Sequence, residues 1–197
     1  MSGSEAITSP VEQEWSLPSR GTVGIISLIA AESAIFLIFV VAYIFYIGKS
    51  ISGPAPRQIL TVPVITSVGL WASSFTIHWA VGALAKGKTL LFTALWFVTL
   101  ALGAFFLAGT AREWHHLIYD EGFTIQTNLF GTTYYSLVGL HASHVVIGLV
   151  ALTVVMIFAL FGKVKPEHHE RCEILSMYWH FVDVVWIVVF IIVYGLS

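Results

Sequence analysis

The stretch MYWHFVDVVW, residues 177–186, lies inside an apolar run that continues to Leu196. The run is long enough to cross a bilayer, which takes about 20 apolar residues. His180 and Asp183 are three residues apart, so a helix places both on one face. Ionisable side chains inside a membrane span are costly and normally turn toward protein or water. We therefore expect this pair to reach each other or a common partner, in surroundings that the other helices provide.

The composition is that of an integral membrane protein. Of 197 residues, 57% are hydrophobic and 10% are charged, whereas soluble domains average roughly 25% charged residues. The length suits one helix bundle. The net charge of −2 gives no support for nucleic-acid binding, and the single cysteine, Cys172, excludes an intrachain disulfide.

The rest of the chain has four further apolar runs of membrane-spanning length. Runs this long and continuous predict helices, because a transmembrane barrel needs short alternating segments. We predict an all-α polytopic membrane protein, a bundle of five transmembrane helices, with a polar N-terminal tail at 1–21 and one domain at 22–197. The predicted spans are Thr22–Ile47, Leu60–Leu84, Thr89–Ala111, Phe130–Phe161 and Arg171–Leu196.

The basic residues predict the orientation. With the N-terminus inside, the inner face carries Arg20, Lys86, Lys88, Lys163, Lys165 and Arg171. The outer face carries Lys49, Arg57 and Arg112. Because cytoplasmic loops hold an excess of Lys and Arg, this distribution favours a cytoplasmic N-terminus and an external C-terminus.

Several ionisable residues are predicted to lie near the middle of the membrane. At 1.5 Å per residue, Glu32 is roughly 15 Å into its span, His180 roughly 13 Å and Asp183 roughly 18 Å. His141 and His144 enter from the other side, to roughly 16 and 21 Å. One interpretation is a polar cluster for proton handling, cofactor binding or docking; the other is hydrogen bonding that holds the helices together.

Two other functions remain open at the level of residues. His141, His144 and His180 are of the type that binds haem or metal, so a self-contained metal-binding membrane protein is one alternative, although no tight ligand set emerges. Glu32 and Asp183 would be the relay of a proton-coupled transporter, although the inverted repeats and broken helices typical of transporters are not visible.

Several motifs together resemble one known family, subunit III of the haem–copper oxidases. The similarity covers most of the chain from about Gly24 onward. It rests on YWHFVDVVW at 178–186 with Glu173 seven residues before His180, GLHASHVVIGL at 139–149, Glu113-Trp114, Gly122-Phe123, Asn128, Phe130-Gly131, and Glu32 followed by Phe36 and Ala42-Tyr43.

The chain departs from the longer form of that family in lacking two additional N-terminal helices, which form one wall of a lipid-filled cleft. The resemblance is therefore to the shorter, five-helix bacterial form. Ala142 and Ser143 also replace the family's usual Gly and an apolar residue, a change that leaves both histidines in place.

The resemblance implies a non-catalytic subunit of an aa3-type cytochrome c oxidase in the aerobic respiratory chain, in the bacterial inner membrane. It implies no haem, copper or catalytic residue in this chain, with haem a and copper in partner subunits. Subunit I would be a direct partner, with subunit II, phospholipids and, through the complex, cytochrome c as others. The subunit would hold lipids and support proton uptake and complex stability. The residues expected to organise its interior are Glu32, His141, His144, Glu173, His180 and Asp183. The alternative within the family is subunit III of a quinol oxidase.

Overall fold

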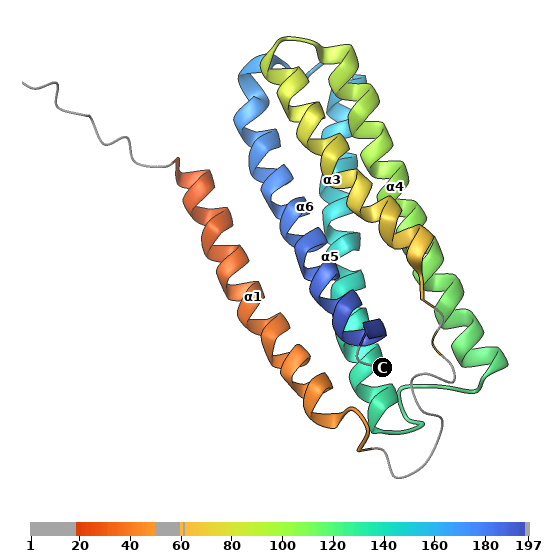
Figure 1. Cartoon of the computed structure of the whole chain (residues 1–197). Helices are drawn as coiled ribbons and strands as arrows, with labels where there is room; N and C mark the ends of the chain where they lie inside the picture. The colour runs from red at the N-terminus through yellow and green to blue at the C-terminus, as the bar shows by residue number, and fades with distance from the viewer. Residues whose placement is uncertain (1–18, 50–59, 61, 196–197) are drawn as a thin grey trace, which may run out of the picture.

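The computed structural model describes residues 19–49, 60 and 62–195. Five long apolar helices follow one another in this part of the chain, which contains no strand. Figure 1 shows them side by side, with α1 along one flank of a tighter group formed by the other four. Their bounds are α1 Arg20–Tyr46, α3 Val64–Ala85, α4 Thr89–His115, α5 Leu129–Leu160 and α6 His169–Phe190.

The prediction of five membrane-spanning helices is confirmed, and most helix ends lie within a few residues of the predicted ones. The third span was predicted too short. It was expected to end near Ala111, but α4 continues to His115 and then into a π-helical turn, His116–Asp120. The apolar run that defined the predicted span ends at Ala111, directly before the charged residues Arg112 and Glu113. In the structure the carboxylate of Glu113 instead accepts hydrogen bonds inside the protein, so the helix does not have to end there.

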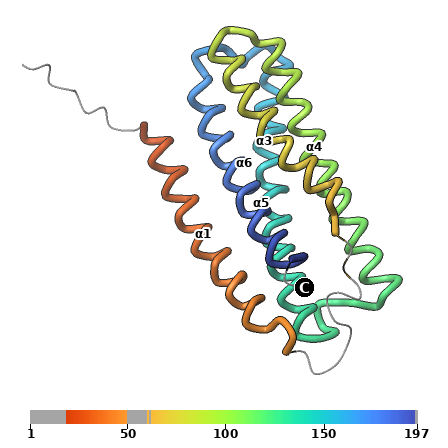
Figure 2. The backbone as a smooth tube through the Cα atoms, viewed as in Figure 1, coloured from red at the N-terminus to blue at the C-terminus, as the bar shows by residue number. Residues whose placement is uncertain are grey.

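Successive helices alternate in direction (Figure 2). The start of α1, the α3–α4 turn and the α5–α6 connection lie at one end of the molecule, which we call the basic end. It carries the cationic residues Arg20, Lys86, Lys88, Lys163, Lys165 and Arg171. The α4–α5 connection and the C-terminus lie at the opposite end (Figure 1).

Glycines with positive φ end the helices at tight turns. Gly87 (φ 73°) follows α3 and Gly162 (φ 66°) follows α5. A left-handed residue directly after a helix lets the chain reverse, and glycine adopts it without steric cost. At the start of α5, Asn128 caps the helix by accepting a hydrogen bond from the backbone N–H of Gly131. These local signals set where each span begins and ends.

The helices differ in how much of them is buried. In the most apolar 18-residue window, 44% of α6 is buried in the molecule, 28% of α3, α4 and α5, and 6% of α1. Two tryptophans of α6 show why. Trp179 and Trp186 are both fully buried, and each donates an indole N–H to a serine of α3, to Ser73 at 2.8 Å and to Ser67 at 3.0 Å. Helix α6 is therefore the central element of the bundle.

Two glycines make room for Trp179. A Cβ at Gly103 of α4 would lie 2.9 Å from the indole, and a Cβ at Gly148 of α5 would lie 2.8 Å from it. Real Cβ atoms do not approach other atoms this closely. Because small residues allow close packing of membrane helices, these positions bring α4 and α5 against opposite parts of the same ring system.

Candidate functional site

A polar contact joins α6 to α3 inside the bundle. Asp183 is 4% exposed and accepts a hydrogen bond from the hydroxyl of Ser74 on α3. The Nδ1 atom of His180 lies 3.1 Å from the same hydroxyl oxygen, and its Nε2 atom lies 3.2 Å from Oγ of Ser176. His180 and Asp183 thus share the partner that their spacing suggested, and that partner is Ser74.

One oxygen of this buried carboxyl has no partner. The Oδ1 atom of Asp183 is inaccessible and accepts no hydrogen bond from the described residues. An unpaired, ionised oxygen in an apolar interior is costly, and protonation removes that cost. The contact therefore gives the bundle a carboxyl group that is suited to carry a proton.

A pocket of about 370 Å³ opens beside this contact, between α3 and α6. It is nearer the basic end, because His169 and Glu173 from the first turns of α6 form part of its wall. His78 and Gly82 line it from α3, and Ser176 and His180 line it from α6. The imidazoles of His78 and His180 are 6.5 Å apart between ring centroids. His180 therefore faces a pocket that His78, His169, Glu173 and Ser176 also line.

A second polar contact joins α1 to α5. The Nδ1 atom of His144 is 2.8 Å from the carbonyl oxygen of Leu140, one turn earlier in its own helix. That atom must carry a hydrogen, since a carbonyl oxygen only accepts. The other ring nitrogen, Nε2, is 3.1 Å from Oε2 of Glu32. One proton lies between these two atoms, so the pair is either ionic or neutral, and in both forms it holds α1 against α5.

His141 is surrounded by aromatic rings. It is fully buried, stacks on Trp186 with 4.8 Å between ring centroids, and meets Phe106 edge to face at 5.7 Å. Neither ring nitrogen has a hydrogen-bond partner among the described residues. Despite its position one turn from His144, it belongs to the aromatic core rather than to the α1–α5 contact.

The six predicted site residues therefore do not gather in one place. Glu32 and His144 form one contact, and His180 and Asp183 form another. Glu173 lies at the pocket mouth, 4.0 Å from the imidazole of His169 across one helical turn. Among the described residues, no three His, Cys, Asp or Glu side chains are arranged to hold a metal ion.

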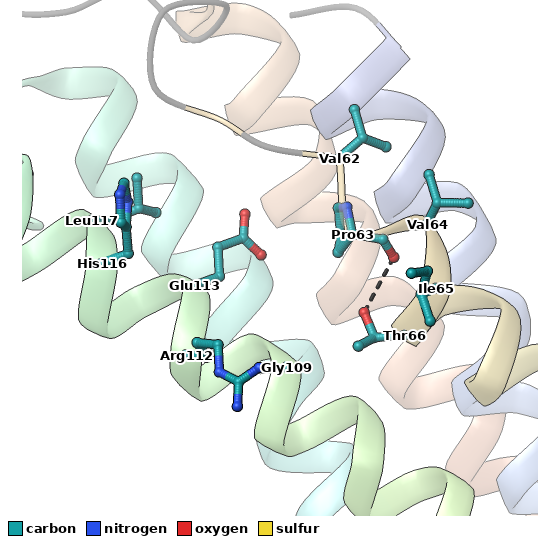
Figure 3. A pocket seen from close by; sticks show the side chains of 10 residues that line it. All are labelled: Val62, Pro63, Val64, Ile65, Thr66, Gly109, Arg112, Glu113, His116 and Leu117. Carbon is teal, nitrogen blue, oxygen red and sulfur yellow. Dashed lines mark hydrogen bonds between the residues drawn. The ribbon is translucent and has the colours of Figure 1, made fainter.

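A third polar contact, at the opposite end, was not among the predicted site residues. The carboxylate of Glu113 accepts hydrogen bonds from Tyr194 at 3.1 Å and from Tyr134 at 3.4 Å. This ties α4 to α5 and to the last turn of the chain. Figure 3 shows Glu113 and Arg112 on α4, with His116 in the π-helical turn that follows it, across a pocket of about 540 Å³ from residues 62–66 at the start of α3.

The residues missed from the sequence are neutral partners of the predicted ones. Ser67, Ser73 and Ser74 bond to α6, and Tyr134 and Tyr194 bond to Glu113. Serines recur on α3 at intervals that keep them near one face, which is the signal that was available. Their partners depend on how α3 is rotated toward α6, which the sequence does not display.

The chain is similar to a family of known proteins over nearly its whole length. The family model described as cytochrome c oxidase subunit III matches residues 19–197. The match therefore includes every helix that the structure describes.

Individual relatives agree with the family match. "Cytochrome c oxidase subunit 3" of Synechocystis sp. is 37% identical over 185 residues, which are 90% of this chain and 76% of that protein. "Probable cytochrome c oxidase subunit 3" of Nocardia farcinica is 36% identical over 183 residues, 90% of this chain and 88% of that protein. The similarity extends to "Cytochrome c oxidase subunit 3" of Canis lupus, 34% identical over 143 residues, which are 73% of this chain and 53% of that protein.

Proposed function

The chain belongs to the cytochrome c oxidase subunit III family, and from this premise we propose that it is the non-catalytic subunit III of an aa3-type cytochrome c oxidase of the aerobic respiratory chain. In this role it packs on the subunit that contains the haem and copper centres. It stabilises the complex, holds phospholipids and supports proton uptake.

The observation that carries this proposal is the extent of the family match. Residues 19–197 include all five helices and the three polar contacts between them. Two bacterial relatives align over 90% of the chain. A similarity of this extent concerns the whole bundle rather than one helix.

The geometry supports a structural role for the ionisable residues. Glu32, His144, His180 and Asp183 each bond to a side chain on another helix. Such bonds link membrane helices for which the lipid offers no competing partner. They also place protonatable groups inside the bundle, as expected for a subunit that supports proton uptake.

We propose a bacterial inner-membrane location with the basic end in the cytoplasm. Six basic residues lie at that end, and Lys49 and Arg112 lie at the opposite end of the described chain. The positive-inside rule then places the start of α1 in the cytoplasm and the end of α6 outside.

The proposed cofactors belong to partner subunits. Haem a and copper are expected in subunit I, copper also in subunit II, and cytochrome c reaches the complex as electron donor. For the chain itself we propose bound phospholipid and direct contact with subunit I.

Affinity purification of the tagged chain in mild detergent tests the assignment. The expected eluate contains larger partner subunits and shows a haem a absorption spectrum, and the spectrum is lost when the chain is separated from those partners. Metal analysis of the eluate extends the test. Copper in excess of that in subunit I, together with a copper-binding subunit II, supports the cytochrome c oxidase, whereas its absence favours a quinol oxidase.

Two outcomes contradict the proposal. Haem or metal retained by the separated chain makes its histidines ligands and favours a self-contained metal-binding protein. A colourless chain that copurifies with no partner removes the oxidase assignment altogether.

A further inference from the structure

We propose that Ser176, His180 and Ser74 form a hydrogen-bonded relay that loads the buried carboxyl of Asp183 with a proton from the pocket between α3 and α6. The relay adds a mechanism to the proposed function. It rests on that function only for the side of the membrane that the pocket faces.

The direction of each hydrogen bond follows from the donors available. When Asp183 is a carboxylate it only accepts, so Ser74 donates its single hydroxyl proton to Oδ2. The oxygen of Ser74 can then only accept from Nδ1 of His180, 3.1 Å away. A neutral imidazole with a proton on Nδ1 has a bare Nε2, and this atom accepts from Ser176 at 3.2 Å. Every donor in the chain therefore points toward Asp183.

Such an arrangement moves one proton by a series of short transfers. A proton that reaches Nε2 of His180, through Ser176 or from water in the pocket, allows Nδ1 to release its own proton to Ser74. Ser74 simultaneously gives its hydroxyl proton to Oδ2. The net change is a carboxylate that becomes a carboxylic acid and an imidazole that exchanges one tautomer for the other. Transfer in the reverse direction restores both groups.

The two ends of the relay have suitable surroundings. The pocket of about 370 Å³ is lined by Ser176 and His180, so the entry point faces its interior. At the other end, Asp183 is buried and its Oδ1 atom accepts no hydrogen bond from the residues that the structure describes, and protonation of the carboxyl relieves this unpaired charge. The relay thus joins an accessible space to a group that benefits from the proton.

Other titratable groups lie near the entry and not along the relay. His78 reaches the pocket from α3, and His169 and Glu173 reach it from α6. His168, in the short 3-10 turn before α6, borders a separate pocket. On the far helices, Glu32 and His144 are occupied with each other. The pocket groups therefore surround the entrance of the proposed relay and interrupt none of its hydrogen bonds.

The test follows the protonated carboxyl of Asp183 by infrared spectroscopy of the purified oxidase complex. Difference spectra between acidic and alkaline buffer contain a carboxylic acid band that Asp183→Asn removes. Rapid mixing with deuterated buffer then measures how fast that band shifts. We expect Ser74→Ala and His180→Phe to slow the shift by about tenfold or more, because each removes a positioned proton donor.

Two further variants separate the relay from general damage. Ser73→Ala removes a neighbouring α3–α6 bond, the one to Trp179, and leaves the relay intact, so its exchange rate should equal that of the unaltered protein. Gly82→Phe fills the pocket from a position that lines it and where an added Cβ atom meets no atom within 4 Å. It leaves every hydrogen bond of the relay in place, yet it should slow exchange to a similar degree as Ser74→Ala.

The proposal is overturned if the Asp183 band shifts equally fast in Ser74→Ala, His180→Phe and Gly82→Phe. It is also overturned if no band depends on Asp183 at any pH, or if Ser73→Ala slows the shift as much as Ser74→Ala. None of these results affects the copurification and haem spectrum that test the assignment as subunit III, so the two proposals fail separately.

Discussion

Helices α1 and α6 cross the molecule over similar lengths but are attached to it in different ways. Helix α6 contributes two buried tryptophans, each bonded to a serine of α3, and the Asp183–Ser74 contact between them. Helix α1 lies on the flank of the bundle, with only 6% of its most apolar window buried, and Glu32 bonds it to His144.

The difference shows what specifies position within a membrane. Apolar side chains gain little by leaving lipid for protein, so close packing and interhelical hydrogen bonds determine which helices associate. Helix α6 makes both kinds of contact and lies at the centre of the bundle. Helix α1 presents a mostly apolar surface to its surroundings. Its polar bonds to the bundle include the Glu32–His144 pair and the hydroxyl of Tyr43, which donates to the carbonyl oxygen of Val193 at 3.5 Å.

The comparison between α6 and α1 is tested most directly at Trp179. Replacing this fully buried residue with alanine leaves a cavity between α3, α4 and α5 and removes a hydrogen bond. We expect it to lower the free energy of unfolding by about 3–5 kcal/mol. Denaturant titration of the chain in detergent, followed by circular dichroism, measures the loss. Trp79→Ala is the control, because Trp79 is 60% exposed; an equal loss in both variants would contradict the prediction.

The next effect is expected at the glycine that accommodates this tryptophan. Gly148→Val places methyl groups where even a Cβ would be 2.8 Å from Trp179. Overpacking of this kind costs about 1–3 kcal/mol. Gly24→Val on α1 is the matched change, since a Cβ there meets no atom within 4 Å. The same titration should register a loss for Gly148→Val alone, and similar losses would mean that α1 is packed as tightly as the centre.

The polar contacts themselves are compared by double-mutant cycles. One cycle combines Ser74→Ala with Asp183→Leu, and the other combines His144→Leu with Glu32→Leu. We expect a coupling energy of about 1–2 kcal/mol for the first pair and about 0.6 kcal/mol for the second, within the range measured for membrane hydrogen bonds, because the first pair is more deeply buried. Asp183→Leu alone should also reduce the yield of stable, active complex. A larger coupling at Glu32–His144 would reverse the comparison.

The smallest effect is expected at the end of the chain. Tyr194→Phe removes one donor from the carboxylate of Glu113 but leaves the bond from Tyr134. We expect a loss of about 0.5 kcal/mol, at the low end for a hydrogen bond. Thermal unfolding of this variant beside Glu113→Gln, which weakens both contacts, shows whether Tyr134 compensates. A loss as large as that at Trp179 would place a second structural centre at this end.

The sequence predicted the number and order of the helices because each span is a long apolar run bounded by charges or glycines. It also predicted that His180 and Asp183 would reach each other or a common partner, and the structure shows the second of these. It did not predict Ser74 as that partner. A helix that is apolar on all sides carries no pattern that shows which face meets a neighbour, so the rotation of α3 toward α6 was not available.

The same limitation explains the end of α4 and the environment of His141. Arg112 and Glu113 directly follow the apolar run of the third span, and their neighbours along the chain do not show that Glu113 has partners inside the protein. The bonds that Glu113 accepts from Tyr134 and Tyr194 depend on residues 21 and 81 positions away. His141 is stacked on Trp186, 45 positions away along the sequence. Such long-range contacts are set by the packing of whole helices.

The central position of α6 has a consequence for biosynthesis. This helix is the last of the five to leave the ribosome, yet it supplies the partners of Ser67, Ser73 and Ser74 on α3. A nascent chain with four inserted helices therefore lacks its central element, and the three serines lack the partners that α6 provides. The bundle can therefore be completed only after α6 has been synthesised and inserted, so these three bonds form later than any contact among the first four helices.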